Sequence, residues 1–239
     1  MKRSSYLANL RKKDQFRHEL KYFIHAAGLL ELKSRLRLTM DRDIHADKRG
    51  NYHVRSLYFD DIYDSAAQTK LAGLEERKKY RLRMYNHNAD NIRLECKKKS
   101  DAGITKRSLW VSSQAAEALI WSERLPKAEL KQPLGREVQA QLTTARLRPV
   151  VIVDYLREAY VMPYQDIRIT LDKRLAVGLN TVGFFDRSLP SMPVLEPGFH
   201  ILEIKFNDFL PSYYRDLLQG IPAQRSAASK FLLCRNWTR

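Results

Sequence analysis

Hydrophobic and polar residues alternate along much of the chain, a pattern that predicts β-strands. In residues 16–24, Glu19 and Lys21 fall on one face and Leu20 and Tyr22 on the other. The same period predicts strands over residues 52–59, 78–85, 91–99, 104–111, 149–155, 156–163, 167–175 and 199–207. Helical spacing predicts helices over residues 26–39, 113–121, 134–146 and 213–218, a short one near Ile62 capped by Asp60 and Asp61, and a turn at 229–230. We therefore expect an α+β fold dominated by antiparallel strands.

The chain is strongly basic, with 43 Lys and Arg against 27 Asp and Glu and a formal net charge of +16. An excess of this size indicates a polyanionic partner, which leaves nucleic acid, an anionic membrane and polyphosphate as candidates. The two cysteines, Cys96 and Cys234, are far apart and lack metal-ligand spacing. Neither a disulfide framework nor a zinc site is predicted, and a reducing cytosol fits best.

Residues 1–14 are polar and basic without a sustained period, and we expect a flexible N-terminal arm there. Residues 15–239 are predicted to form a single domain. No apolar run approaches the roughly 20 residues that a membrane-spanning helix needs. We therefore expect a cytoplasmic protein, free or peripheral at the inner face of a membrane, and a membrane-protein partner is compatible with this sequence.

Each of the main strands carries a charged face. These faces hold Glu19 and Lys21; Lys79, Arg81, Arg83 and Tyr85; Arg93, Glu95, Lys97 and Lys99; Tyr155 and Arg157; Arg168 and Thr170; and Glu203 and Lys205. For one strand, a solvated outer face is the simpler interpretation. The predicted helices, however, need apolar surface to cover, and the opposite strand faces supply it. The charged faces would then line the polar, cationic lumen of a closed antiparallel β-barrel clad by helices.

A lumen lined by many unpaired cations must hold water or an anion, because burying one unpaired ion costs several kcal/mol. The guanidinium group of arginine binds two phosphate oxygens at once, and the ammonium group of lysine places a single charge at the end of a flexible side chain. Alternating arginines and lysines therefore match an extended phosphate chain. Glu203, with Glu19 or Glu95, supplies hard oxygen ligands for Mg²⁺ or Mn²⁺ bridging the phosphates.

Short motifs in a fixed order along the chain resemble those of the VTC domain. They are Glu19-Leu20-Lys21-Tyr22, Ser56-Leu57-Tyr58-Phe59-Asp60, Tyr80-Arg81-Leu82-Arg83, Leu94-Glu95-Cys96-Lys97, Leu147-Arg148-Pro149-Val150-Val151, Tyr155-Leu156-Arg157, Arg168-Ile169-Thr170-Leu171-Asp172, Leu202-Glu203-Ile204-Lys205 and Ser229-Lys230-Phe231. Each motif alone is weak, but nine in register span residues 17–231, nearly the whole chain.

The resemblance implies a triphosphate tunnel metalloenzyme of the CYTH-like superfamily, and within it a polyphosphate polymerase. Such an enzyme transfers the γ-phosphoryl group of ATP to a growing polyphosphate chain with the help of a metal ion. The implied catalytic residues are Arg81, Arg83, Arg157, Arg168 and Glu203. The expected phosphate and nucleotide ligands are Lys21, Arg81, Arg83, Lys97, Tyr155, Arg157, Arg168, Lys205, Ser229 and Lys230, and the expected metal ligands are Glu203, Glu95 and Glu19.

One departure from the superfamily pattern bears on the reaction. The first strand often carries E-x-E-x-K, but Arg17 stands at the first glutamate position here. This favours the polymerase branch over the hydrolytic and cyclase branches. A triphosphatase or polyphosphatase on the same fold and a non-catalytic polyphosphate-binding protein remain alternatives. Nucleic acid is not expected, because only Tyr85 and Tyr155 offer stacking surfaces on the basic strands.

Overall fold

The computed structural model describes residues 17–101, 103–162, 166–207 and 209–238, so the predicted arm over residues 1–14 lies outside the described residues. Within them the strands form one 11-stranded antiparallel sheet in the order β11-β1-β10-β8-β7-β3-β4-β5-β6, with β2 paired to β7 and β9 paired to β8. The strands are β1 (Arg17–His25), β2 (Asp41–Arg42), β3 (Tyr52–Asp60), β4 (Arg77–Tyr85), β5 (Ile92–Ser100), β6 (Gly103–Val111), β7 (Arg148–Met162), β8 (Ile167–Gly178), β9 (Ser191–Pro193), β10 (Phe199–Asn207) and β11 (Ala223–Arg225). The α+β fold class is confirmed.

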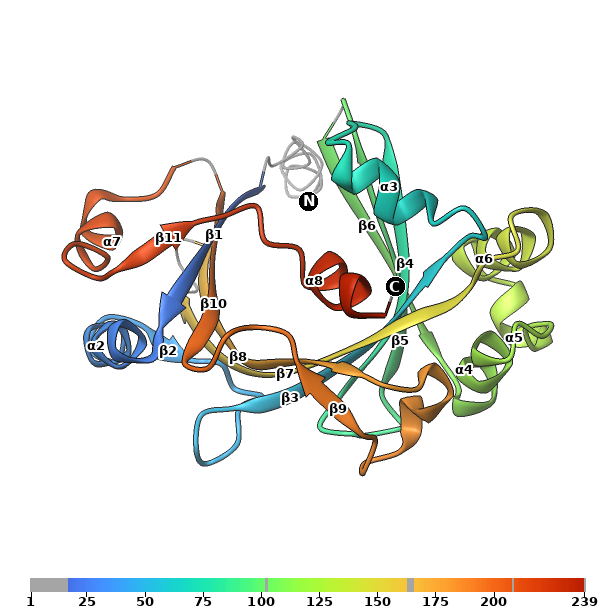
Figure 1. Ribbon diagram of the computed structural model, residues 1–239, viewed down its shortest axis with the longest axis horizontal. Coiled ribbons are helices and arrows are strands. Elements are labelled where there is room, and N and C mark those ends of the chain that lie inside the picture. Colours follow the sequence, from blue (N-terminus) through green and yellow to red (C-terminus); the bar gives the residue numbers. More distant parts are fainter. Residues whose placement is uncertain (1–16, 102, 163–165, 208, 239) are drawn as a thin grey trace, which may run out of the picture.

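The sheet bends into a trough (Figure 1). Strands β11, β1 and β10 form one arm, β8, β7 and β3 form the floor, and β4, β5 and β6 form the other arm. No ladder joins β6 to β11 or β1 among the described residues, so the prediction of a closed barrel is wrong. Alternation determines which side chains share a face, but it carries no information on whether the outermost strands of a curved sheet bond to each other.

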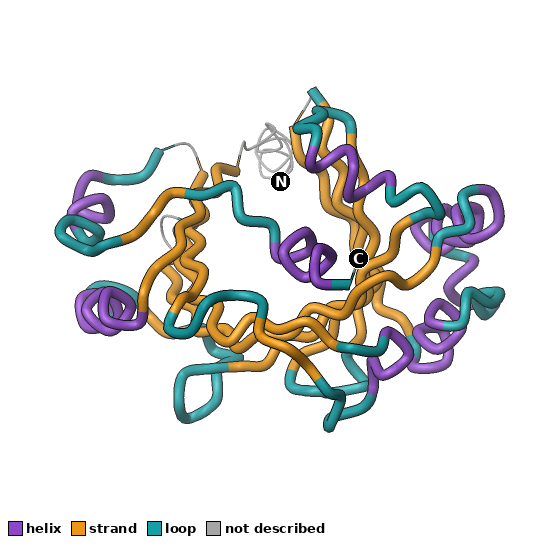
Figure 2. Tube along the Cα trace, viewed as in Figure 1, coloured by secondary structure: helices purple, strands orange, loops and turns teal. Residues whose placement is uncertain are grey.

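Helices cover the convex side of both arms, as Figure 2 shows. They are α2 (Ala26–Leu36) and α7 (Ser212–Asp216) on one arm, and α4 (Ser113–Ile120), α5 (Lys127–Leu130) and α6 (Pro133–Thr144) on the other. Leu32 and Leu36 of α2 pack with Ile169 and Ile204 of the sheet, whereas Leu119 of α4 packs in a separate core. The expected helical cladding of the apolar strand faces is therefore present. No helix in the described ranges has both the length and the apolarity to cross a membrane.

Helix α8 (Lys230–Trp237) lies inside the trough, over β7 and β8 (Figure 1). Its Phe231 ring lies 5.0 Å from the ring of Tyr58 on β3, and Cys234 is fully buried in the same core. The sequence predicted only a helical turn at this position. Its first residue, Lys230, also pairs with the buried carboxylates of Asp172 and Glu203, so the helix packs against both apolar and charged parts of the concave face.

Two predicted boundaries differ from the structure for local reasons. Strand β7 is continuous where two strands were predicted, because a register shift between Asp154 and Leu156 interrupts the alternation without ending the ladder. Helix α3 (Ser65–Leu71) begins later than predicted, although Asp60 does cap it: its carboxylate accepts the backbone N–H groups of Ala66 and Ala67 at 2.8 and 3.0 Å. Within the described ranges, the elements that the sequence did not predict are β2, β9, β11, α5 and the 3₁₀ helix η2 (Thr181–Phe185).

Candidate functional site

Three rows of side chains cross the arm formed by β4, β5 and β6, because the strand register places them opposite one another. The rows are Lys79, Lys97 and Lys106; Tyr58, Arg81, Glu95 and Ser108; and Ser56, Arg83, Arg93 and Trp110. On the other arm Lys21 lies opposite Glu203 and Glu19 lies opposite Lys205. The charged strand faces of the sequence therefore meet across one concave surface.

Glu203 is the centre of the cation cluster on the β1 and β10 arm. Its carboxylate lies 2.5 Å from the ammonium of Lys230, 3.1 Å from that of Lys205 and 3.8 Å from the guanidinium of Arg157. Lys21 follows at 4.0 Å. Burial raises the pKa of Glu203, but Lys230, Lys205, Arg157 and Lys21 outweigh it and hold this pKa well below the ordinary value. Glu203 is thus an ionised carboxylate that joins four predicted ligands.

Asp172 shares the cations of this cluster, although it is not among the site residues predicted from the sequence. Arg157 donates two hydrogen bonds to its carboxylate, at 2.6 and 2.7 Å, and Lys230 lies 2.6 Å away. Asp172 is fully buried. It belongs to the Arg168–Asp172 motif at even spacing from Arg168 and Thr170, so the alternation could have identified it. Its effect is to fix the direction of the Arg157 guanidinium.

The second arm holds two arginines in defined orientations. Arg81 donates from Nε to Glu95 at 2.6 Å and from Nη1 to the Tyr58 hydroxyl at 2.9 Å. Lys106 also contacts Glu95. Burial raises the pKa of Glu95, but the arginines and Lys106 lower it to about 2, so this carboxylate is ionised.

Arg83 is buried in the next row of the same arm. It donates from Nε to the Ser56 hydroxyl at 3.0 Å and from Nη2 to the Tyr155 hydroxyl at 3.4 Å. Both partners are neutral hydroxyls, and the carboxylate that Arg83 influences is Glu95 in the neighbouring row, whose pKa it helps to lower. The fully buried Tyr155, a predicted hydroxyl ligand, positions this guanidinium.

Arg168 lies opposite Lys205 in the ladder between β8 and β10. It donates to Asp43 at 2.5 Å and to the Tyr52 hydroxyl at 3.0 Å. Asp43 offsets part of its charge, and Tyr52 also lies opposite Arg157, so Arg168 borders the Glu203 cluster. Ser229 precedes α8, and its side chain makes no capping hydrogen bond. This leaves its hydroxyl available beside Lys230.

Lys79 is the centre of a cluster of cations that also contains Lys70, Arg77, Lys21 and Lys97. The ammonium of Lys79 lies 4.6 Å from the centroid of the Phe231 ring, and Lys79 forms no ion pair with any described residue. Burial lowers its pKa to about 7, and the neighbouring cations Lys70, Arg77, Lys21 and Lys97 add to that effect. Such crowding of cations favours a bound polyanion.

Two of the three predicted metal ligands lie close together. Glu19 is 3.5 Å and Glu203 is 3.1 Å from the same ammonium, that of Lys205. Glu95 lies on the other arm with Arg81 and Lys106. No group of three or more His, Cys, Asp or Glu side chains suited to a metal occurs in the described part of the chain. Because Mg²⁺ bound to phosphates needs only one or two protein carboxylates, Glu19 and Glu203 fit such an ion.

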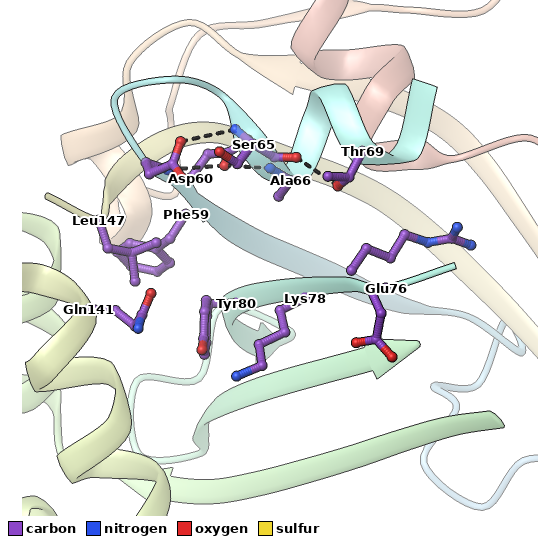
Figure 3. Close-up of a pocket in the computed structure, with 12 residues that line it drawn as sticks. Phe59, Asp60, Ser65, Ala66, Thr69, Glu76, Lys78, Tyr80, Gln141 and Leu147 are labelled. Atoms are coloured by element: carbon purple, nitrogen blue, oxygen red, sulfur yellow. Dashed lines mark hydrogen bonds between the residues drawn. The ribbon is translucent and has the colours of Figure 1, made fainter. Parts of the chain in front are cut away.

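A separate cavity of about 260 Å³ lies between α3, β4 and α6 (Figure 3). Phe59, Tyr80 and Leu147 form its apolar side, and Asp60 caps α3 at its rim. None of the predicted site residues lines it. The concave face, rather than this cavity, is therefore the candidate site.

Comparison with known proteins agrees with this fold. A family model described as VTC domain matches residues 16–237. A putative adenylate cyclase from Bacillus halodurans superposes with a TM-score of 0.53 at 14% identity, over 91% of this chain and 96% of that one. The PH1819 protein from Pyrococcus horikoshii OT3 gives a TM-score of 0.49 at 13% identity, over 92% and 98%. No curated protein matches. At such identities the likeness to the first structure shows a common fold.

Proposed function

Because the chain belongs to the VTC domain family, we propose that it is an ATP-dependent polyphosphate polymerase. It transfers the γ-phosphoryl group of ATP to the end of a polyphosphate chain that lies in the trough. ATP and polyphosphate are the proposed substrates, which agrees with the cytoplasmic location expected from the sequence. The two described cysteines, Cys96 and Cys234, are free and buried, as a reducing compartment allows.

The observation that carries this proposal is the facing of two cationic walls across one concave surface. Arg81 and Arg83 point from one arm, and Lys21, Lys205 and Lys230 approach from the other arm and from α8. A phosphate chain carries acceptor oxygens on all sides, so it can bind both walls at once. Surface lysines on a single face would not provide such a site.

The arginines have distinct parts in the proposed reaction. Arg83 donates to the hydroxyls of Ser56 and Tyr155 and meets the triphosphate with its guanidinium group. Arg157 is oriented by Asp172 and meets the phosphates beside Lys230. Phosphoryl transfer requires little covalent assistance, so holding donor and acceptor in line and neutralising the developing charge supply most of the catalysis.

A divalent cation, Mg²⁺ or Mn²⁺, is part of this proposal. Glu203 and Glu19 would hold it together with phosphate oxygens, and when bound it would neutralise charge on the transferred phosphoryl group. In its absence the same carboxylates are paired with Lys205 and Lys21. The lysines can therefore bind phosphate when the carboxylates bind the metal.

The deciding experiment is to incubate the purified protein with ATP and Mn²⁺ or Mg²⁺ and to measure polyphosphate length, ADP and free phosphate together. We expect long chains, with ADP in excess of free phosphate. Arg83→Ala and Glu203→Ala should each reduce synthesis on the order of 100-fold or more. Arg107→Ala, on the convex face where Arg107 pairs with Glu137, is the matched control.

Three outcomes would contradict the proposal in different ways. ADP matched by free phosphate would indicate a triphosphatase. Tight polyphosphate binding without turnover would indicate a binding protein. Full activity in both site variants would show that the residues were assigned incorrectly.

A further inference from the structure

Trp110 is an exposed aromatic residue on the charged concave face. It lies on β6, the last strand of the second arm, and its relative exposure is 56%. The guanidinium carbon of Arg93 lies 4.1 Å from the centroid of its ring. One face of the indole is therefore covered by a cation, and the side chain remains open to solvent at the rim of the trough. Burial of apolar surface does not explain this position.

The other two tryptophans are also exposed but occupy different surfaces. Trp121 ends α4 on the convex side, and Trp237 ends α8. Trp110 is the one of the three that shares a cross-strand row with the phosphate-facing arginines. In that row it is opposite Arg93, which is opposite Arg83.

Arg93 is held differently from the arginines nearer the centre of the site. Its Nε atom is buried and has no hydrogen-bond partner among the described residues. Stacking on Trp110 therefore orients it, whereas Arg81 is oriented by the Glu95 carboxylate. An arginine packed on an indole remains charged and can still bind an anion. The contact also restricts the motion of the indole ring, which favours stacking of a second group on it.

We propose that Trp110, backed by Arg93, is the nucleobase platform of the ATP site. The proposal rests on the proposed function, since it assigns the place of the donor nucleotide. Neighbouring strands are about 4.8 Å apart, so Trp110 and Arg83 are separated by roughly 10 Å, a gap that the ribose and α-phosphate would bridge. The base stacks on the free indole surface, Arg93 faces the α-phosphate, and the terminal phosphates reach Arg83 and Arg81.

This placement defines the order in which the nucleoside, the transferred phosphoryl group and the phosphate chain lie along the arm. The nucleoside occupies the row of Trp110, the transferred phosphoryl group lies near the row of Arg81, and the row of Lys79, Lys97 and Lys106 follows on the far side. That last row holds cations and no aromatic ring, so it suits a phosphate chain and offers nothing to a base.

The test compares two ligands that share a triphosphate but differ in the nucleoside: ATP and inorganic tripolyphosphate. Calorimetry on the full chain should show that Trp110→Ala weakens ATP binding on the order of tenfold, because stacking on an aromatic ring contributes roughly that much per base. Tripolyphosphate binding should not change. Trp110→Phe should keep most of the ATP affinity, and Trp121→Ala should match the wild type for both ligands.

The outcomes separate this proposal from the one on which it rests. Equal weakening of both ligands by Trp110→Ala, or no change in either, overturns the nucleobase platform while wild-type polyphosphate synthesis leaves the function intact. Failure of the wild-type protein to bind tripolyphosphate overturns both. Thermal unfolding of each variant checks that the fold is retained, and Trp110→Phe supplies the comparison if the alanine variant is unstable.

Discussion

Lys97 on β5 lies 3.7 Å from Glu19 on β1, although these strands belong to opposite arms of the trough. Five other strands stand between them in the sheet order, so the contact crosses the open side of the sheet. A side-chain bridge thus spans the gap where a closed barrel would have backbone hydrogen bonds. Half of the Lys97 side chain is exposed. Such pairs contribute about 1 kcal/mol at most, and a phosphate chain can displace the carboxylate.

Replacing Glu19 by Gln tests this exchange. The variant leaves Lys97 without a carboxylate partner among the described residues and leaves Lys21 and Lys205 with Glu203 alone. We therefore expect metal-free tripolyphosphate affinity to rise about fivefold. The gain in affinity on adding Mn²⁺ should disappear, because one of the two proposed metal ligands is lost. Calorimetry with and without the metal measures both effects, with Glu117→Gln on the exposed side of α4 as the control. An unchanged metal effect would remove Glu19 from the metal site.

Glu203→Gln should destabilise the ligand-free protein on the order of 3 kcal/mol, because it leaves Lys230, Lys205 and Arg157 facing one another with less compensation. The low pKa of Glu203 determines the pH range of this effect. The stabilisation of the fold by ionised Glu203 is complete above pH 4.5, the ordinary pKa of a glutamate, and is lost as the pH falls below that value. Urea unfolding at several pH values should therefore show the two proteins converging in acid. Added tripolyphosphate should restore much of the lost stability, and the absence of both effects would refute this role.

The sequence predicted most of the strands and the charged faces, because alternation records directly which side chains share a face. Glu19, Lys21, Glu203 and Lys205 meet on the first arm as that pattern requires. The ordered motifs added Lys230, which lies far from these residues in sequence and has no periodic signal of its own.

Other features depend on packing that no local pattern encodes. The position of α8 inside the trough follows from burial of Phe231 and Cys234 against strands that are distant in the chain. The carboxylate partner of Arg168 is Asp43, a loop residue without a periodic signal. Trp110 was overlooked because its exposure, and not its residue type, distinguishes it from a core tryptophan.

Arg55 provides a test of which arginines belong to the scaffold. It is buried on the other face of β3, donates to Asp154 at 2.8 Å and holds η2 through the backbone carbonyls of Phe184 and Asp186. Arg55→Met should cost about 3–5 kcal/mol in the free energy of unfolding, because it leaves Asp154 buried without its partner. Activity per folded molecule should persist. The double variant with Asp154→Leu should recover part of the stability, and a stable but inactive Arg55→Met would place Arg55 in the site instead.

Lys79 should make polyphosphate binding sensitive to pH near neutrality. Its pKa of about 7 in the free protein means that it is largely neutral above that pH, and a bound polyanion favours the charged form. Wild-type affinity for tripolyphosphate should therefore fall between about pH 6 and about pH 8.5, with proton uptake on binding. In Lys79→Met the uptake should vanish and the decline should flatten, whereas Lys98→Met, on the opposite face of β5, should follow the wild type. Calorimetry in buffers of different ionisation enthalpy measures the uptake, and parallel profiles for the wild type and Lys79→Met would contradict a titrating Lys79.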